Sequence, residues 1–415
     1  MQVLKFRFEM TGCRGAVPAG GARWRLPAVV LLLCLGAFSF TEKAPAQASS
    51  LRKRSEVFSR LPLTKFYDTP APLGPGKPGG LIRASAFDEY RLPPSVSATR
   101  ILYYSRAANG ELVAASGVVL FPDQKPPSGG WPLIAWAHAL SGVARVCAPS
   151  LERNVGDGPL LAMYVNLGYA VVATDYTGLG TNFPNAFADA QSNAWNVIDS
   201  VAAAHDAVPG IGSRWIAMGA GEGAMAALRV AEVERADGNS NLLGSIAISR
   251  IADLEDQFEP ALTPSSDSAL LLAHGIKAID PIFKPEEILT SQAMPVYQKE
   301  QEECGVPEAS KVPPAAMFRP GWQSNKFVRA YFNRNRAGET RADAPLLIIS
   351  GEEGAAMVAI MKVVRRMCGQ GDRLLFRRYA EGDPGSVIGD SAREQMSWIQ
   401  DRFAGRAAPA NCSEQ

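Results

Sequence analysis

The sequence has almost no net charge. Its 42 lysine and arginine residues are balanced by 41 aspartate and glutamate residues, and no block of basic residues interrupts that balance. Proteins that bind nucleic acid or an anionic membrane surface usually present a basic patch or an excess of positive charge. The composition therefore argues against nucleic acid and against an anionic membrane surface as partners.

Long apolar runs are also missing. The most apolar stretch, residues 26–40, is shorter than the roughly 20 residues that a membrane-spanning helix needs. Arg23 and Arg25 precede it, and the small-residue site Ala46-Gln47-Ala48 follows. This order is typical of a secretory signal peptide. We predict that residues 1–48 are a signal peptide cleaved near Ala48, which leaves a secreted chain without a stable membrane span. An uncleaved anchor is the alternative.

Cysteine is scarce, with six residues and no C-x-x-C pair. Cys13 and Cys34 lie in the predicted signal peptide. An even number of remaining cysteines in an oxidising compartment predicts two disulfides, for which spacing alone allows three pairings. Since no histidine lies near a cysteine pair, we expect no zinc site and no other metal or cofactor. The four cysteines of the mature chain are Cys147, Cys304, Cys368 and Cys412.

What the chain does contain is an alternation of strand-like and helix-like segments. Such an alternation predicts an α/β fold with a mostly parallel sheet, right-handed crossovers and flanking helices. The first two strand-like runs flank Ala108-Asn109-Gly110, which indicates a hairpin. The expected strands are 99–106, 112–121, 133–137, 170–175, 215–218, 245–249, 346–350 and 374–379. The expected helices are 160–167, 193–207, 223–236, 355–368 and 391–403.

The regular alternation predicts the domain organisation. Residues 49–95 are rich in proline and glycine and should form an extended N-terminal arm. The α/β core should comprise residues 96–250 and 344–404, with a tail at 405–415. Residues 251–343 break the alternation and are best explained as a helical cap inserted into the core. Ligands of open α/β sheets bind at the carboxyl ends of the strands, so the cap should cover the site.

One short segment has the pattern of a nucleophile elbow. A strand-like run ends in Gly219-Ala220-Gly221-Glu222-Gly223 and is followed by a helix-like run. The spacing matches the G-x-S-x-G turn, in which a serine stands on a sharp strand-to-helix bend. Here Gly221 occupies the serine position and has no side chain that could attack a carbonyl group.

The chain resembles the secretory lipases, a family of exported α/β-hydrolase proteins. The resemblance runs through FYDTPAPLGPGKPGGLIR, RILYYSRAANGELVAASGVVLFP, WPLIAWAHALSGVARVCAPS, GYAVVATDYTGLGT, the elbow and the final PLLIISGEEG, YAEGDPGSVIGDS and WIQDRFAG segments. It implies ester hydrolysis by serine, aspartate and histidine under a helical cap. It also implies an oxyanion hole at the His138-Ala139-Leu140 turn and the amide of Glu222, and disulfides joining Cys147 to Cys304 and Cys368 to Cys412.

All three triad positions of that family are substituted in this sequence. Gly221 replaces the serine, Gly354 of Gly351-Glu352-Glu353-Gly354 replaces the aspartate, and Pro384 of Asp383-Pro384-Gly385 replaces the histidine. If this alignment is off by one or two residues, Glu352 or Glu353 could supply the acid. No such shift restores the base, because the fold orders nucleophile, acid and then histidine, and no histidine follows His274.

The three histidines of the chain have structural explanations. His205 lies on an expected helix, facing solvent or the helix end, and His274 should be a satisfied residue inside the cap. His138 ends a strand and should orient the following turn through a hydrogen bond. A serine hydroxyl needs a neighbouring base to become a nucleophile. The sequence therefore does not predict an active serine esterase.

Three hypotheses about function remain. The first is a catalytically silent family member that binds a fatty acid or acyl ester; no protein partner can be named. The second is an active ester hydrolase that uses Ser141, Glu222, Glu353 or Asp383. The third is a dinucleotide-binding protein, because Gly219 to Ala224 also fits G-x-G-x-x-A between a strand and a helix. Arg250 after the next strand could then accept a 2′-phosphate.

Overall fold

A nine-stranded sheet forms the centre of the computed structural model, which describes residues 60–234, 241–249, 251–258, 266–305, 311–379 and 386–414. The predicted signal peptide, Arg250, Asp383 and Pro384 lie outside the described residues. The strand order is β1-β2-β3-β5-β4-β6-β7-β8-β9. The strands are β1 (Leu81–Ala86), β2 (Val96–Arg106), β3 (Leu112–Pro122), β4 (Trp131–Ala137), β5 (Ala170–Thr174), β6 (Ile211–Ala220), β7 (Leu242–Ile248), β8 (Leu346–Ser350) and β9 (Leu374–Arg378).

The predicted α/β fold with a mostly parallel sheet is confirmed. β1, β2, β3 and β5 pair antiparallel, and all pairs from β5 through β4 to β9 are parallel. Every residue of β4 except Pro132, and every residue of β5 and β8, is buried. This explains why these strands appear in the sequence as continuous apolar runs, since helices cover both faces of a parallel sheet.

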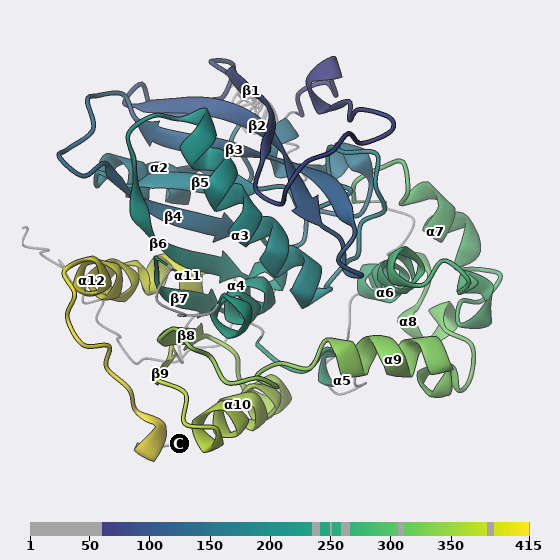
Figure 1. Cartoon of the computed structure of the whole chain (residues 1–415). Coiled ribbons are helices and arrows are strands. Elements are labelled where there is room, and N and C mark those ends of the chain that lie inside the picture. The colour runs from purple at the N-terminus through teal and green to yellow at the C-terminus, as the bar shows by residue number, and fades with distance from the viewer. Residues whose placement is uncertain are drawn as a thin grey trace, which may run out of the picture. The chain divides into compact units, whose positions relative to one another are not determined.

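Helices cover the sheet on two sides (Figure 1). On one face α3 (Ala190–Ala207), α4 (Glu222–Val233) and α10 (Gly354–Gly369) bury their apolar sides against the strands. On the other face α2 (Gly158–Asn166) and α12 (Ala392–Phe403) do the same, and α11 (Val387–Asp390) leads into α12. No helix within the described ranges combines the length and apolar character needed to span a membrane.

The N-terminal region contains a strand that the sequence did not reveal. Residues 49–95 were expected to form an extended arm, but β1 lies within this range and pairs antiparallel with β2 at the edge of the sheet. The proline and glycine residues on its N-terminal side obscured a six-residue strand. An edge strand has only one partner, so it carries a weaker apolar signal than the central strands.

The helical segment between β7 and β8, here called the cap, has an apolar core of its own. Sixteen buried residues form this cluster, including Leu272, Phe283, Val328 and Phe332. In Figure 1 the cap lies beyond the ends of the strands toward which the arrows of the parallel sheet point. Its helices are α5 (Leu254–Gln257), α6 (Ser266–Ile279), α7 (Met294–Lys299), α8 (Pro314–Met317) and α9 (Lys326–Arg334), with short 3-10 turns at Pro285–Glu287 and Trp322–Ser324.

Candidate functional site

Gly221 forms the turn between β6 and α4. Its backbone has φ 57° and ψ −117°, a conformation that L-residues adopt only when the surrounding structure holds them there. Nucleophile elbows impose such a sharp bend between strand and helix on their central residue. A Cβ atom at this position would lie 3.3 Å from the Cβ of Ala139. The chain therefore keeps the backbone of an elbow and lacks the side chain that would react.

The neighbouring glycines are required by packing. A Cβ atom on Gly219 would lie 2.2 Å from the carbonyl oxygen of Gly223, and one on Gly223 would lie 2.0 Å from that of Ala137. Both distances are far inside van der Waals contact, so helix α4 can approach β6 and β4 only with glycine at these positions. The close approach of helix and strand accounts for the G-x-G-x-x-A spacing without a bound nucleotide.

His138 holds the turn that follows β4. The side chain is 4% exposed, its Nδ1 donates to the carbonyl oxygen of Ala139 (2.6 Å), and its ring stacks on Tyr176 at 4.2 Å. The Tyr176 hydroxyl donates to the His138 carbonyl oxygen (2.9 Å). Burial lowers the pKa of His138 to about 4, which keeps the ring neutral near pH 7. These contacts fix the Ala139-Leu140 turn against the elbow.

A buried aspartate fixes the other wall of this site. Asp175 accepts hydrogen bonds from the Ser116 hydroxyl (2.7 Å) and from the amide and hydroxyl of Ser150 (2.8 and 2.5 Å). Burial raises the pKa of Asp175 to about 6. Tyr67 and Tyr90 donate to the Ser150 carbonyl oxygen and so join the N-terminal arm to this network. Asp175, at the centre of this network, directly precedes Tyr176, the residue on which His138 stacks.

Glu222, the first residue of α4, directs its carboxylate toward the start of α3. Its Oε1 accepts hydrogen bonds from the Ala188 amide (2.8 Å) and from the Asn193 side chain (3.0 Å). Burial raises the pKa of Glu222 to about 7, and the two hydrogen bonds only partly offset that effect. Ala188 and Asn193 could not be recognised as partners of Glu222 from the sequence, because the contact depends on how the loop after β5 returns to the elbow.

The turn after β8 contains Gly354, which the sequence predicts at the position of the family's acid. Gly354 has φ 56° and begins α10, and space is open around it. Glu352 is buried and its Oε1 accepts from the Ser249 hydroxyl at 3.4 Å. Glu353 is exposed and lies 3.8 Å from Arg378. Carboxylates thus stand beside the glycine, while the position of the histidine, Pro384, is outside the described residues.

The other two histidines are held by their own surroundings. His205 lies in the last turn of α3, as one of the two expected positions had it, and is half-buried rather than facing solvent; its ring nitrogens contact the carbonyl oxygens of Val201 (2.8 Å) and Gly212 (3.0 Å). His274 of α6 stacks on Tyr297 at 3.9 Å, and its Nε2 lies 3.6 Å from Glu300. Burial lowers the pKa of His274 to about 4. Each ring joins its own helix to a neighbouring element, β6 for His205 and α7 for His274.

Four cavities within the described residues adjoin the turn after β4 or the cap, and one of about 270 Å³ lies between residues 107–113 and residues 278–281. One of about 430 Å³ is lined by residues 138–141, with Arg60 and Glu152 among its other walls. One of about 220 Å³ lies between residues 140–143 and Leu271 and Glu300 of the cap. The largest, about 650 Å³, lies between residues 178–185 and helices α6 and α7. No group of three or more His, Cys, Asp or Glu side chains suited to a metal occurs within the described part of the chain.

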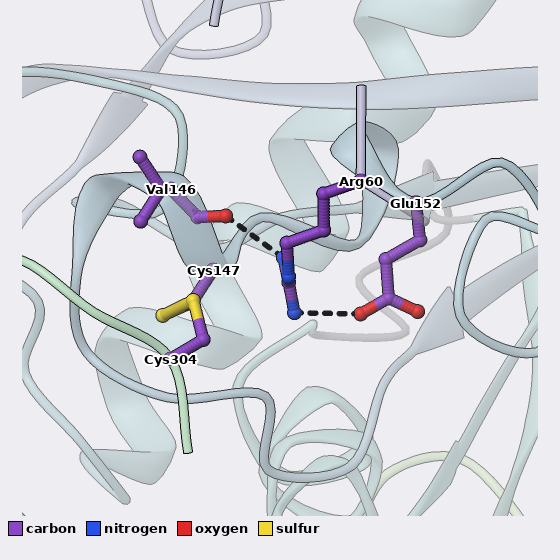
Figure 2. Close-up of a disulfide and its surroundings, with 5 residues drawn as sticks. All are labelled: Arg60, Val146, Cys147, Glu152 and Cys304. Atoms are coloured by element: carbon purple, nitrogen blue, oxygen red, sulfur yellow. Dashed lines mark hydrogen bonds and ion pairs between the residues drawn. A yellow bond between two sulfur atoms is a disulfide. The ribbon is translucent and has the colours of Figure 1, made fainter. Parts of the chain in front are cut away.

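Two disulfides join distant parts of the chain. Cys147 pairs with Cys304, and Cys368 pairs with Cys412, which is the pairing that the family resemblance implied. Figure 2 shows the first of them beside Arg60, which donates to the Val146 carbonyl oxygen (2.8 Å) and pairs with Glu152 (2.7 Å). Cys304 follows α7, so this disulfide ties the cap to the core next to the 430 Å³ cavity.

Comparisons with solved structures place this architecture among the α/β-hydrolases. The chain is similar to lipase A of Candida antarctica in its closed state, with a TM-score of 0.68, 16% identity and coverage of 84% of this chain and 88% of that one. It is also similar to a rice cell wall degrading esterase, LipA, of Xanthomonas oryzae (TM-score 0.63, 17% identity, 79% and 97% coverage). A hydrolase described as putative from Legionella pneumophila gives a TM-score of 0.65 at 18% identity, with 79% and 99% coverage.

Sequence comparison gives the family. No curated protein matches the chain by sequence. The family model described as secretory lipase matches residues 156–411, which include the elbow, the cap, the turn after β8 and the C-terminal helices. This match covers more than half of the chain and agrees with the fold. The chain therefore belongs to the secretory lipase family.

Proposed function

We propose that this protein is a secretory-lipase family member that does not hydrolyse esters through a serine triad and instead binds an acyl ligand beneath its cap. The observation that carries the proposal is Gly221, whose backbone keeps the elbow conformation without a nucleophile. Triad members act as a unit, so the loss of several leaves only what binding and the oxyanion hole contribute. The two disulfides suit an oxidising, extracytoplasmic compartment, as proposed from the N-terminal segment.

Several features of the site support binding of an acyl group. The first amides of α4 have no partner within the helix, and the helix dipole favours a negative group at that end. Glu222 would oppose an anion if it faced the elbow, but its carboxylate is bound by Ala188 and Asn193. Leu140, Val143 and Leu271 supply apolar walls to the 220 Å³ cavity. A fatty acid or an acyl ester fits this combination.

A panel of nitrophenyl esters tests the catalytic half of the proposal. We expect no turnover above background by the mature wild-type protein. A Gly221→Ser, Gly354→Asp, Pro384→His variant should gain measurable esterase activity, because the variant regains a nucleophile, an acid and a base on a retained backbone. Turnover by the wild type would contradict the proposal and favour an active hydrolase that uses other residues.

Thermal unfolding with saturated fatty acids of increasing length tests the binding half. Binding to the folded state raises Tm in proportion to the logarithm of ligand concentration. We expect a rise in Tm that depends on the chain length of the fatty acid. A short-chain carboxylate is the control and should leave Tm unchanged. An unchanged Tm across the whole series would refute acyl binding.

An unconventional hydrolase is the second candidate, because Ser141 lines two of the cavities. Its Oγ is buried without a hydrogen-bond partner, so no base activates it in the described structure. Glu222 is occupied by Ala188 and Asn193, and Glu353 is exposed near Arg378. A Ser141→Ala variant in the ester panel distinguishes this candidate, since any wild-type activity should then disappear.

A further inference from the structure

Residues 187–190, here called the linking turn, connect the loop after β5 to α3 and are held by the cap. The Phe187 carbonyl oxygen accepts a hydrogen bond from the Tyr331 hydroxyl of α9. Asp189 pairs with Arg334, and the Ala190 amide donates to the Asn335 side chain (2.9 Å) at the end of the same helix. Three of the four residues of the turn are therefore attached to the last helix of the cap.

The remaining residue of the linking turn is held by the elbow. The Ala188 amide donates to Glu222 Oε1 at 2.8 Å, and Glu222 directly follows Gly221. Ala188 has φ 58°, a left-handed conformation that is unfavourable for an L-residue. Such a conformation persists only where neighbouring contacts hold it. The hydrogen bond to Glu222 holds Ala188 from the elbow side.

A second cap helix packs tightly at the same place. A Cβ atom on Gly275 of α6 would lie 2.6 Å from the Phe187 carbonyl oxygen and 2.5 Å from the Tyr331 hydroxyl. Glycine is thus needed there for α6, α9 and the linking turn to meet. The elbow helix α4, the start of α3 and two cap helices converge on four residues. A change in one contact of the linking turn can therefore alter how the cap helices pack.

We propose that the Glu222 carboxyl group latches the cap to the nucleophile elbow through the linking turn, and that loss of its proton weakens this latch. Such a latch would couple the state of the elbow to access beneath the cap. The latch involves only contacts within the protein, so it does not depend on whether an acyl ligand binds at the site.

The direction of the pH effect follows from burial. Burial raises the pKa of Glu222 to about 7 in the latched state, whereas a carboxyl group released into water has a pKa near 4.5. The latched state therefore binds the proton more tightly, and acid favours it. As the pH rises through about 7, Glu222 loses its proton in the latched state. The ionised carboxylate is more stable in water than in the buried site, so release becomes more favourable. The cap should be held firmly near pH 5 and more loosely near pH 8.

Two tyrosines lie close enough to Glu222 for its charge to act on them. They are Tyr176, in the turn after β5, and Tyr331 of α9, and burial keeps the pKa of both well above the usual value. Asp189 at the start of α3 is paired with Arg334 of α9. His138, stacked on Tyr176, stays neutral because its pKa is about 4. Within this group of residues, Glu222 is the one expected to lose its proton between pH 5 and pH 8.

Amide hydrogen exchange of α9, corrected for the intrinsic rate at each pH, tests the latch. Wild-type exchange should rise by about tenfold to a hundredfold between pH 5 and pH 8, since one proton changes the opening equilibrium by up to tenfold per pH unit between the released pKa near 4.5 and the latched pKa of about 7. Glu222→Gln keeps a neutral acceptor for Ala188 and Asn193, so α9 should stay protected at both pH values. Glu222→Ala removes the acceptor and should raise α9 exchange about tenfold or more at both.

Glu232→Gln is the matched control. Glu232 lies on the same helix, burial raises its pKa also to about 7, and its partner is Arg229 (2.7 Å) rather than the linking turn. This variant should keep the wild-type pH response in α9. Exchange of α12 reports whether each variant is folded. A wild-type α9 that exchanges equally at both pH values would overturn the latch, as would a pH response that survives in Glu222→Gln.

Discussion

Single residues at the carboxyl ends of the strands keep an unusual backbone although the nucleophile is gone. Tyr176 follows β5 with φ 51°, Gly221 follows β6 with φ 57°, and Ser249 follows β7 with φ 64°. Tyr176 and Ser249 adopt a left-handed conformation that costs each about 1–3 kcal/mol. Strained residues of this kind cluster at functional sites, where the surrounding contacts maintain them. Their retention supports a site that still binds a ligand.

The Gly221→Ser variant tests whether the backbone of the elbow tolerates a serine side chain. We expect a loss of about 1–3 kcal/mol in the free energy of unfolding, because a Cβ atom at φ 57° is strained and would lie 3.3 Å from Ala139. We expect no ester hydrolysis, since no base accompanies the serine. Gly371→Ser is the control, because Gly371 also has a positive φ but no atom within 4 Å of its Cβ position. Chemical denaturation of both variants separates the cost of the backbone conformation from the cost of the contact with Ala139. Ester hydrolysis by the Gly221→Ser variant would contradict the prediction.

At the scale of elements, apolar runs in the sequence located most of the fold. The expected strand at 346–350 coincides with β8, and the expected helix at 193–207 matches α3 except for its first three residues. Asp189 caps α3 by accepting from the Ser192 amide (2.8 Å), a signal that was present in the sequence. The contact of Glu222 with Ala188 could not be predicted, because it joins residues whose approach depends on a long loop and on the cap.

Removing the disulfide between Cys147 and Cys304 should loosen the cap and leave the core folded. This link closes a long loop, with a sequence separation of 157, and contributes on the order of 5 kcal/mol in the chain-entropy model. The Cys147→Ser, Cys304→Ser variant should have a lower Tm and should be cleaved faster by protease near residue 304. The Cys368→Ser, Cys412→Ser variant is the control, because its link pins the tail to α10. Equal protection of the cap in both variants would contradict this role.

Across the whole molecule, buried carboxyl groups outnumber buried histidines among the shifted groups. Burial raises the pKa of Glu222 and Glu232 to about 7 and that of Asp175 and Asp372 to about 6. An acid with a raised pKa binds more protons in the folded state, so it stabilises the fold as the pH falls toward its unfolded value. His138 and His274 have a pKa lowered to about 4, and they oppose this gain as the pH falls through about 6.5, because histidines of the unfolded chain take up protons there.

The thermal stability should therefore increase when the pH is lowered from 8 to 6. In this interval the two glutamates on α4 bind protons in the folded state, and this gain exceeds the loss from the two histidines, which take up protons only in the unfolded chain. We expect Tm to rise by about 2 °C, measured by calorimetry at constant ionic strength. The Glu222→Gln, Glu232→Gln double variant should lose most of this rise, because neither position can then take up a proton. A Tm that falls on acidification, or a rise that persists in the double variant, would show that other groups govern the pH response.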